Sequence, residues 1–275
     1  MTIRSDWSRL SRAARDAAYN NSEAVPDSPV IVAKRASGSA AYRAAHPGKL
    51  DISYGPRERN AWDLFPAAAA AAPCLVFIHG GYWQRNSRDA ASVLCEGIRA
   101  HGWSAAFPGY TLAPDATLTQ IVAEIHAALD WLALHGTDHG VGGKIVVTGW
   151  SAGGHLTAMA LSHPAVTAAL AISGVFELGP IRDTYLNEKL QLSDAEVESL
   201  SPLRLPVVMK PMSLAYGSAE LPALVEDSRA LHARRAAAHA PGALLPIPGA
   251  NHFDILDHLQ AKDGLITRQI LDLAS

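Results

Sequence analysis

The sequence predicts an α/β protein with an open, doubly wound, mostly parallel sheet of about eight strands. Three features predict it: apolar runs that are nearly continuous, helical patterns between those runs, and a pair of alternating segments ahead of them. With 275 residues, 49% of them hydrophobic and 18% charged, the chain can bury one large core. We therefore expect a single domain over residues 1–275.

The predicted strands fall into two kinds. Residues 50–54 and 61–65 alternate apolar and polar side chains around a polar turn, which predicts an antiparallel hairpin at a sheet edge. The later runs are almost entirely apolar, as is typical of strands covered on both faces. They span 74–79, 103–107, 144–149, 167–173, 211–216 and 243–247.

Helical patterns separate these runs, at about 87–101, 117–135, 153–163, 222–239 and 257–273. The tract 66–73, alanines between two prolines, is too short to be stable as a free helix and predicts a connector. Residues 174–206 do not fit the alternation of strand and helix. We interpret them as an insertion over the site that could serve as a lid.

Charge and cysteine content exclude several classes of protein. There are 23 Lys and Arg against 26 Asp and Glu, so no basic field is available for a nucleic acid, and we expect none as a partner. The charged N-terminus lacks the apolar core of a signal peptide, and no window is apolar enough to span a bilayer, so we expect a cytoplasmic protein without membrane contact. Cys74 and Cys95 predict buried thiols rather than a disulfide or a metal site. The sequence does not specify an oligomeric state, and a homodimer stays open.

The strongest motif is a G-x-S-x-G pattern at 149–153, between an apolar strand and a predicted helix. A tight strand-to-helix turn needs glycines beside the serine and exposes the hydroxyl of Ser151 as a nucleophile. The amide of Ala152 then stands at a helix start, where an oxyanion is stabilised. The alternative is a turn without chemistry.

A second motif, HGGYW at 79–83, ends the strand at 74–79. Its backbone amides, which we assign to Gly81 and Tyr82, would complete the oxyanion hole. We expect His79 to brace this loop by hydrogen bonding, because no metal-ligand spacing accompanies it. Tyr82 and Trp83 are candidates for lining the substrate pocket, although packing in the core is the alternative for Trp83.

The base and its acid come from the last third of the chain. His252 follows the last predicted strand and would accept the proton of Ser151. Glu220 follows the strand at 211–216 and would orient the imidazole; Asp227, inside the next helix, and Asp254 are the alternatives. Two further pocket candidates are His155, one turn beyond the nucleophile, and Phe253, beside the base.

Over nearly its whole length the chain resembles the α/β-hydrolase superfamily, with the order Ser, acid, His, and within it the arylformamidase (kynurenine formamidase) group. Four segments carry the narrower resemblance: HGGYW, GWSAGGHL, SGVFELGPI with the later SP, and YTLAPDATL. The group's acid is usually Asp, whereas this chain has Glu220 in the matching loop. The resemblance implies hydrolysis of N-formylkynurenine or related aryl formamides, and of small esters.

These residues together predict a serine hydrolase that needs neither a metal nor another cofactor and acts on a small ester or formamide. One alternative is a short-chain carboxylesterase without a role in kynurenine metabolism. Another is a binding protein of the same fold that holds a small ligand without turnover.

Overall fold

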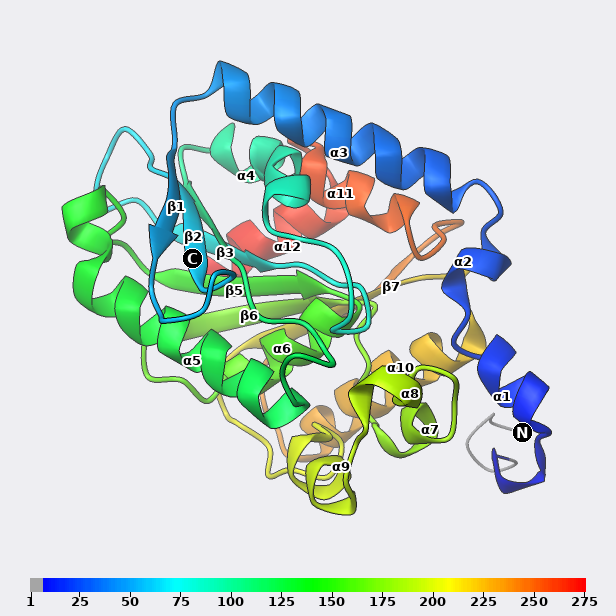
Figure 1. Ribbon diagram of the computed structural model, residues 1–275. Coiled ribbons are helices and arrows are strands. Elements are labelled where there is room, and N and C mark those ends of the chain that lie inside the picture. Colours follow the sequence, from blue (N-terminus) through cyan, green and yellow to red (C-terminus); the bar gives the residue numbers. More distant parts are fainter. Residues whose placement is uncertain (1–6) are drawn as a thin grey trace.

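The computed structural model describes residues 7–275; residues 1–6, which begin the charged N-terminal stretch, lie outside the described residues. The strands are β1 (Lys49–Ser53), β2 (Ala61–Phe65), β3 (Cys74–Ile78), β4 (Ser104–Pro108), β5 (Ile145–Trp150), β6 (Val166–Ile172), β7 (Met212–Gly217) and β8 (Leu244–Ile247). They form one sheet in the order β1-β2-β4-β3-β5-β6-β7-β8 (Figure 1). β1 and β4 both pair antiparallel with β2, and the remaining neighbours pair parallel, which confirms the predicted sheet and its hairpin.

The central strands are buried on both faces. Every residue of β3, β4, β5 and β7 is buried, whereas β1, at the sheet edge, shows no buried residue. A strand covered by helices on both sides must be apolar throughout, because neither face meets water. This is the pattern from which the strands were predicted.

The second strand of the hairpin differs from the expectation. The hairpin lies at the sheet edge, as predicted, but its second strand β2 lies between β1 and β4, and all residues of β2 are buried although its sequence alternates apolar and polar side chains. The buried carboxylate of Asp63 is therefore paired, with the guanidinium groups of Arg43 and Arg88. Two cations make burial of this charge tolerable within an otherwise apolar layer.

Helices cover the sheet in two layers (Figure 1). One apolar cluster joins the first face of the sheet to α5 (Leu118–His135), α6 (Ala152–Ala160) and α10 (Pro222–Ala237). A second cluster joins the opposite face to α3 (Ser28–Ala45), the 3-10 helix η2 (Asp89–Cys95), α4 (Glu96–Arg99), α11 (Asp257–Gln260) and α12 (Leu265–Ala274). The pattern at 87–101 is thus η2 followed by α4, and the pattern at 257–273 is broken into α11 and α12.

The N-terminal segment contributes helices that the sequence patterns did not indicate: α1 (Arg12–Ala17), α2 (Asn21–Ala24) and α3. The sequence of α3 includes Gly38, three serines and two valines, which are weak helix formers. Tertiary packing explains its length, since α3 lies along η2, where Tyr42 is buried and the Ser39 hydroxyl accepts the amide of Val93 at 3.2 Å.

Residues 174–206 contain three short helices, α7 (Gly179–Arg182), α8 (Asn187–Leu190) and α9 (Asp194–Leu200). Two further 3-10 turns occur, η3 (Gly136–His139) and η4 (Asp254–Leu256). Residues 66–73 form bends and turns, as expected of a connector, and Cys74 and Cys95 are buried free thiols. Among the residues that the structure describes, no helix has both the length and the apolar character needed to cross a membrane.

Candidate active site

Ser151 stands at the junction of β5 and α6 in a backbone conformation that serine rarely adopts. Its φ and ψ are 59° and −119°, while its amide donates to the carbonyl of Ile172 at 2.8 Å and its carbonyl accepts the amide of His155 at 3.1 Å. Such a conformation persists only where surrounding structure enforces it, and it is common at functional sites. The turn that the G-x-S-x-G motif predicts is present.

The two glycines of that motif are required by close backbone approach. A Cβ at Gly149 would lie 2.3 Å from the carbonyl oxygen of Gly153, and one at Gly153 would lie 2.0 Å from that of Ile78. Neither clash involves a flexible side chain, so any larger residue would displace the turn or strand β3. The spacing of small residues therefore sets how closely α6 approaches the sheet.

The loop after β3 faces this turn. A Cβ at Gly80 would lie 2.5 Å from the carbonyl oxygen of Trp150 and 3.0 Å from the Cβ of Ser151. Gly81, Tyr82 and Trp83 have φ values of 113°, 51° and 58°, an unusual succession of left-handed residues. As the first residue of α6, Ala152 has an amide with no acceptor inside the helix. The predicted oxyanion donors thus come from segments in direct contact.

His79 braces the loop, as its sequence context predicted. Its Nδ1 lies 2.9 Å from the carbonyl oxygen of Gly80, and its ring stacks on Tyr110 with centroids 4.3 Å apart. The Tyr110 hydroxyl donates to the His79 carbonyl at 2.9 Å. Burial lowers the pKa of His79 to about 4, so the ring is neutral near pH 7 and holds the loop by hydrogen bonding rather than by charge.

Glu220 and His252, which lie 32 residues apart in sequence, meet at the carboxyl ends of β7 and β8. The Nδ1 of His252 lies 2.8 Å from Oε2 of Glu220, and both side chains are buried. The other carboxylate oxygen accepts the hydroxyl of Ser173 and the amide of Gly217, each at 2.6 Å. Because Oε1 is held from two sides, Oε2 is directed at the imidazole.

The alternative acids are engaged elsewhere. Asp227 is buried in α10 and accepts backbone amides of Phe176 and Glu177, which fixes the start of the 174–206 segment. Asp254 accepts the amide of Asn251 at 2.7 Å and its side-chain amide at 2.6 Å, and so stabilises the turn that carries His252. Among the three candidates, the structure brings only Glu220 to the imidazole.

The loop that carries His252 is also hydrogen-bonded to the turn at Ser151. The indole N–H of Trp150 donates to the carbonyl of His252 at 2.8 Å, and the two rings lie 4.9 Å apart. Trp150 directly precedes Ser151, so the same turn positions nucleophile and histidine together. Ser151 and His252 both line a cavity of about 190 Å³.

Two of the four predicted pocket residues line that cavity, namely Tyr82 and Phe253. Trp83 and His155, which were also predicted to line the pocket, do not line this cavity. Both are fully buried in the core, where the rings meet edge to face at 5.1 Å. The Nε2 of His155 lies 2.7 Å from the carbonyl oxygen of Leu200, so this ring joins α6 to the end of α9, and burial lowers its pKa to about 4.

Tyr82 lines the cavity, and its hydroxyl already makes two hydrogen bonds within the protein. Its hydroxyl donates to the carbonyl of Tyr19 at 2.7 Å and accepts the side-chain amide of Asn21 at 2.9 Å. Burial raises the pKa of Tyr82 well above its ordinary value, so the hydroxyl keeps its proton. The N-terminal segment thereby clamps the loop that carries the predicted oxyanion donors.

Part of the cavity wall was missed by sequence reasoning. It comes from the N-terminal segment, through Asn21, Ser22, Ser28, Pro29 and Val32, and from the loop after Trp83, through Arg85 and Asn86. No local motif identifies these residues, because they reach the site only by tertiary packing. A proline one residue after Ser28 is a helix-start signal that could have identified α3.

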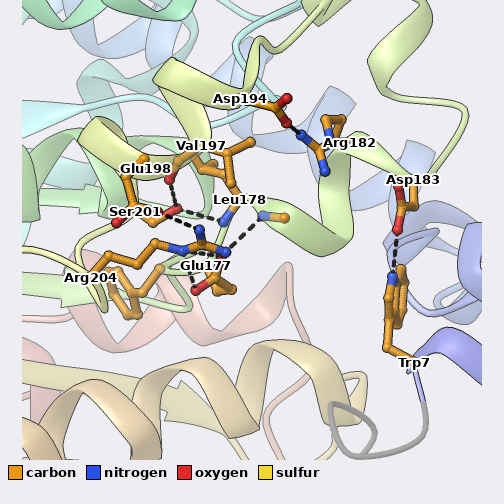
Figure 2. A network of polar contacts seen from close by, with 12 residues as sticks. Trp7, Glu177, Leu178, Arg182, Asp183, Asp194, Val197, Glu198, Ser201 and Arg204 are labelled. Atoms are coloured by element: carbon orange, nitrogen blue, oxygen red, sulfur yellow. Dashed lines mark hydrogen bonds and ion pairs between the residues drawn. The ribbon is translucent and has the colours of Figure 1, made fainter.

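The 174–206 segment is held to itself and to the N-terminal segment by polar contacts (Figure 2). Arg204 binds Glu177 and Glu198, each at 2.7 Å, and the indole of Trp7 donates to Asp183 at 3.0 Å. The amide of Tyr185 also donates to Asp16 at 2.8 Å. Whether this segment moves as a lid stays a prediction. In residues 7–275, no cluster of His, Cys, Asp or Glu is arranged to hold a metal ion.

Known proteins that are similar to this chain include a kynurenine formamidase and esterases. The BD-FAE family model matches residues 63–171. A kynurenine formamidase of Danio rerio is 25% identical over 98% of both chains, and esterase LipC of Mycobacterium tuberculosis is 28% identical over 72% of this chain and 57% of its own. A solved structure of a candidate thioesterase from Silicibacter sp. TM1040 has a TM-score of 0.84 at 26% identity, covering 93% of this chain and 98% of that one.

The fold and these similarities agree with one another. The likeness to the formamidase and to the solved structure extends over nearly the whole chain. The chain therefore has the α/β-hydrolase fold and is similar to kynurenine formamidases and to esterases.

Proposed function

We propose that the protein is a serine hydrolase that cleaves aryl formamides of the N-formylkynurenine type and small carboxylic esters through an acyl-enzyme. The observation that carries the proposal is the hydrogen bond of 2.8 Å between His252 and Glu220, beside a cavity that Ser151 also lines. The similarity to a kynurenine formamidase supports the formamide part.

The first half of the reaction forms the acyl-enzyme. Glu220 accepts a hydrogen bond from the Nδ1–H group of His252, which keeps the proton on Nδ1 and leaves Nε2 as the acceptor for the hydroxyl proton of Ser151. The serine oxygen then bonds to the substrate carbonyl, whose oxygen becomes negative. The amides of Gly81, Tyr82 and Ala152 stabilise this charge, and each such donor is worth roughly 3 kcal/mol of barrier.

Collapse of this intermediate breaks the bond between the carbonyl carbon and the leaving group. His252 returns the proton to the departing aromatic amine, or to the alcohol of an ester. A water molecule then attacks the acyl-enzyme with His252 again as the base, and the acid is released with Ser151 restored. For a formamide this acid is formate, so almost all substrate atoms that contact the pocket belong to the leaving group.

A carboxylesterase is the second candidate, favoured by the likeness to esterase LipC. The two are separated by kcat/KM for N-formylkynurenine and for p-nitrophenyl acetate, measured on the same purified protein. We expect both to be hydrolysed. Turnover of the acetate without detectable release of formate from the formamide would contradict the formamidase assignment and leave the esterase.

The identity of the nucleophile has its own test. A fluorophosphonate should label Ser151 in the folded protein, and Ser151→Ala should lose about 10⁴-fold or more in kcat while keeping its circular dichroism spectrum. Ser162, an exposed serine beyond the end of α6, offers a matched control, and Ser162→Ala should keep full activity. An unlabelled Ser151 with no turnover would favour the ligand-binding alternative.

A further inference from the structure

The wall of the active-site cavity is uneven in polarity. Trp150, Phe253, Pro29 and Val32 supply apolar surface, whereas the N-terminal segment and the loop after Trp83 supply polar groups. Among these polar groups, which include neutral amides and hydroxyls, Arg85 is the one permanent charge. A ligand in this cavity therefore meets an apolar surface and a cation.

Arg85 has no internal partner in the part of the chain that the structure describes: it is exposed, and no carboxylate of residues 7–275 forms an ion pair with it. Arg88, three residues later, differs in this respect, because it pairs with both Asp51 and Asp63. An arginine that holds the fold together is expected to be paired, as Arg88 is. The guanidinium of Arg85 is free to bind an external anion.

The position of Arg85 places this charge next to the reaction centre. A Cβ at Gly81 would lie 2.5 Å from the carbonyl oxygen of Arg85 and 2.9 Å from its Cγ, so the arginine stem lies against one of the proposed oxyanion donors. The charge of Arg85 also acts on Tyr82, another residue of the cavity wall. Burial raises the pKa of Tyr82 and of Tyr185, and the charge of Arg85 opposes the rise at both.

We propose that Arg85 binds a carboxylate on the leaving group of the substrate, so that the enzyme prefers aryl formamides or aryl esters whose amine or alcohol part is anionic. This inference rests on the proposed function. A formyl group is too small to reach the cavity wall, so within about 190 Å³ the group that meets Arg85 belongs to the leaving amine. The planar guanidinium matches a carboxylate with two parallel hydrogen bonds, and the aromatic ring would lie against the apolar side.

The test uses probes of equal size that differ in charge: 3-formamidobenzoate against 3-formamidobenzamide, and the corresponding 3-acetoxy esters. We expect wild-type kcat/KM to favour the benzoate by about tenfold, a preference that weakens as salt screens the charge. Arg85→Gln should remove the preference, because it should lower kcat/KM for the benzoate about tenfold more than for the benzamide. Arg85→Lys should retain part of it, and Arg85→Glu should invert it.

A matched control is Arg268→Gln, which removes an exposed arginine from α12, away from the cavity, with the same change in net charge. It should alter neither probe. Equal wild-type rates for benzoate and benzamide, or an equal loss of both in Arg85→Gln, would overturn the inference.

A binding measurement separates this inference from the proposed function. In the Ser151→Ala background, calorimetry with the product analogues 3-aminobenzoate and 3-aminobenzamide needs no turnover. Tighter binding of the benzoate, lost in Arg85→Gln, would support Arg85 even if neither probe were hydrolysed by wild type, in which case only the proposed function would fail. Equal binding of the two analogues would contradict Arg85 as a carboxylate site.

Discussion

On one side of the cavity, the candidate catalytic residues follow parallel strands of one sheet: Ser151 after β5, Glu220 after β7 and His252 after β8. On the other side, the wall comes from the N-terminal segment, which rests on side-chain hydrogen bonds such as that of Asn21 to Tyr82. The sheet fixes the positions of the residues on the strand-end side, because each of them follows one of its strands. The N-terminal side depends on a few long-range contacts, so we expect changes there to alter rate and specificity moderately and changes at the strand ends to abolish turnover.

The sharpest way to test this contrast is to remove the acid. Glu220→Gln keeps the size of the side chain but offers His252 an amide, which permits the wrong tautomer. We expect kcat to fall about 10³- to 10⁴-fold with little change in KM, measured on the better of the two substrate classes. A loss below tenfold would contradict the role of Glu220, and Asp254→Asn would then be examined as the alternative.

Removing the support of the acid should have a smaller effect. Ser173→Ala deletes the hydroxyl that holds Oε1 of Glu220, while the amide of Gly217 remains. A hydrogen bond to a charged group contributes about 1.5–3 kcal/mol, so we expect kcat to fall by about tenfold or more at nearly constant KM. The matched control is Ser213→Ala, which removes a buried serine hydroxyl of β7 that accepts the amide of Ala243. It should change stability without changing kcat.

A change on the N-terminal side should be milder still. Tyr82→Phe keeps the ring in the cavity wall and removes the hydroxyl that joins Tyr19 and Asn21. Leaving these buried groups without a partner should lower the free energy of unfolding by about 1–3 kcal/mol and reduce kcat a few-fold, as the strained loop loosens.

The control for Tyr82→Phe is Tyr54→Phe, which removes a hydroxyl that donates to Gly109 outside the cavity. Both variants should lose stability in urea unfolding, but only Tyr82→Phe should lose activity. Equal kcat in the two variants would mean that the N-terminal clamp has no part in catalysis.

The smallest expected effect is the dependence of stability on pH, which arises from two histidines buried in the core. Burial lowers the pKa of His79 and His155 to about 4, below the ordinary value of about 6.5. Between these values the unfolded chain binds protons that the folded chain does not, so stability is full above pH 6.5 and decreases as pH falls toward 4, by at most about 3 kcal/mol per histidine. Urea unfolding at pH 7.5, 6 and 5 measures this slope.

The variant His155→Gln tests the source of that pH dependence, because its side-chain amide can still donate to Leu200 without titrating. We expect a smaller loss of stability between pH 7.5 and 5 than in wild type. His46→Gln, at an exposed histidine, is the control. An unchanged slope in His155→Gln would assign the acid sensitivity to other groups.

Much of the strand-end side was predictable because its signals are local. Gly149 is required by a contact within a single turn, with the carbonyl oxygen of Gly153, and a buried parallel strand must be apolar on both faces. The sequence therefore specified the eight strands, the turn at Ser151 and the loop at 79–83. It also favoured Glu220 over Asp227, because only a residue directly after a strand reaches the sheet edge where the nucleophile stands.

Other features were decided by tertiary structure, because they depend on partners distant in sequence. Trp83 and Tyr82 are adjacent aromatic residues, yet one turns into the core against His155 and the other binds Asn21 at the cavity. The helix at Ser28–Ala45 has weak intrinsic propensity and exists through its packing on η2. A sequence pattern records which residues suit a local conformation, whereas the surface that a side chain meets is fixed only when distant segments pack together.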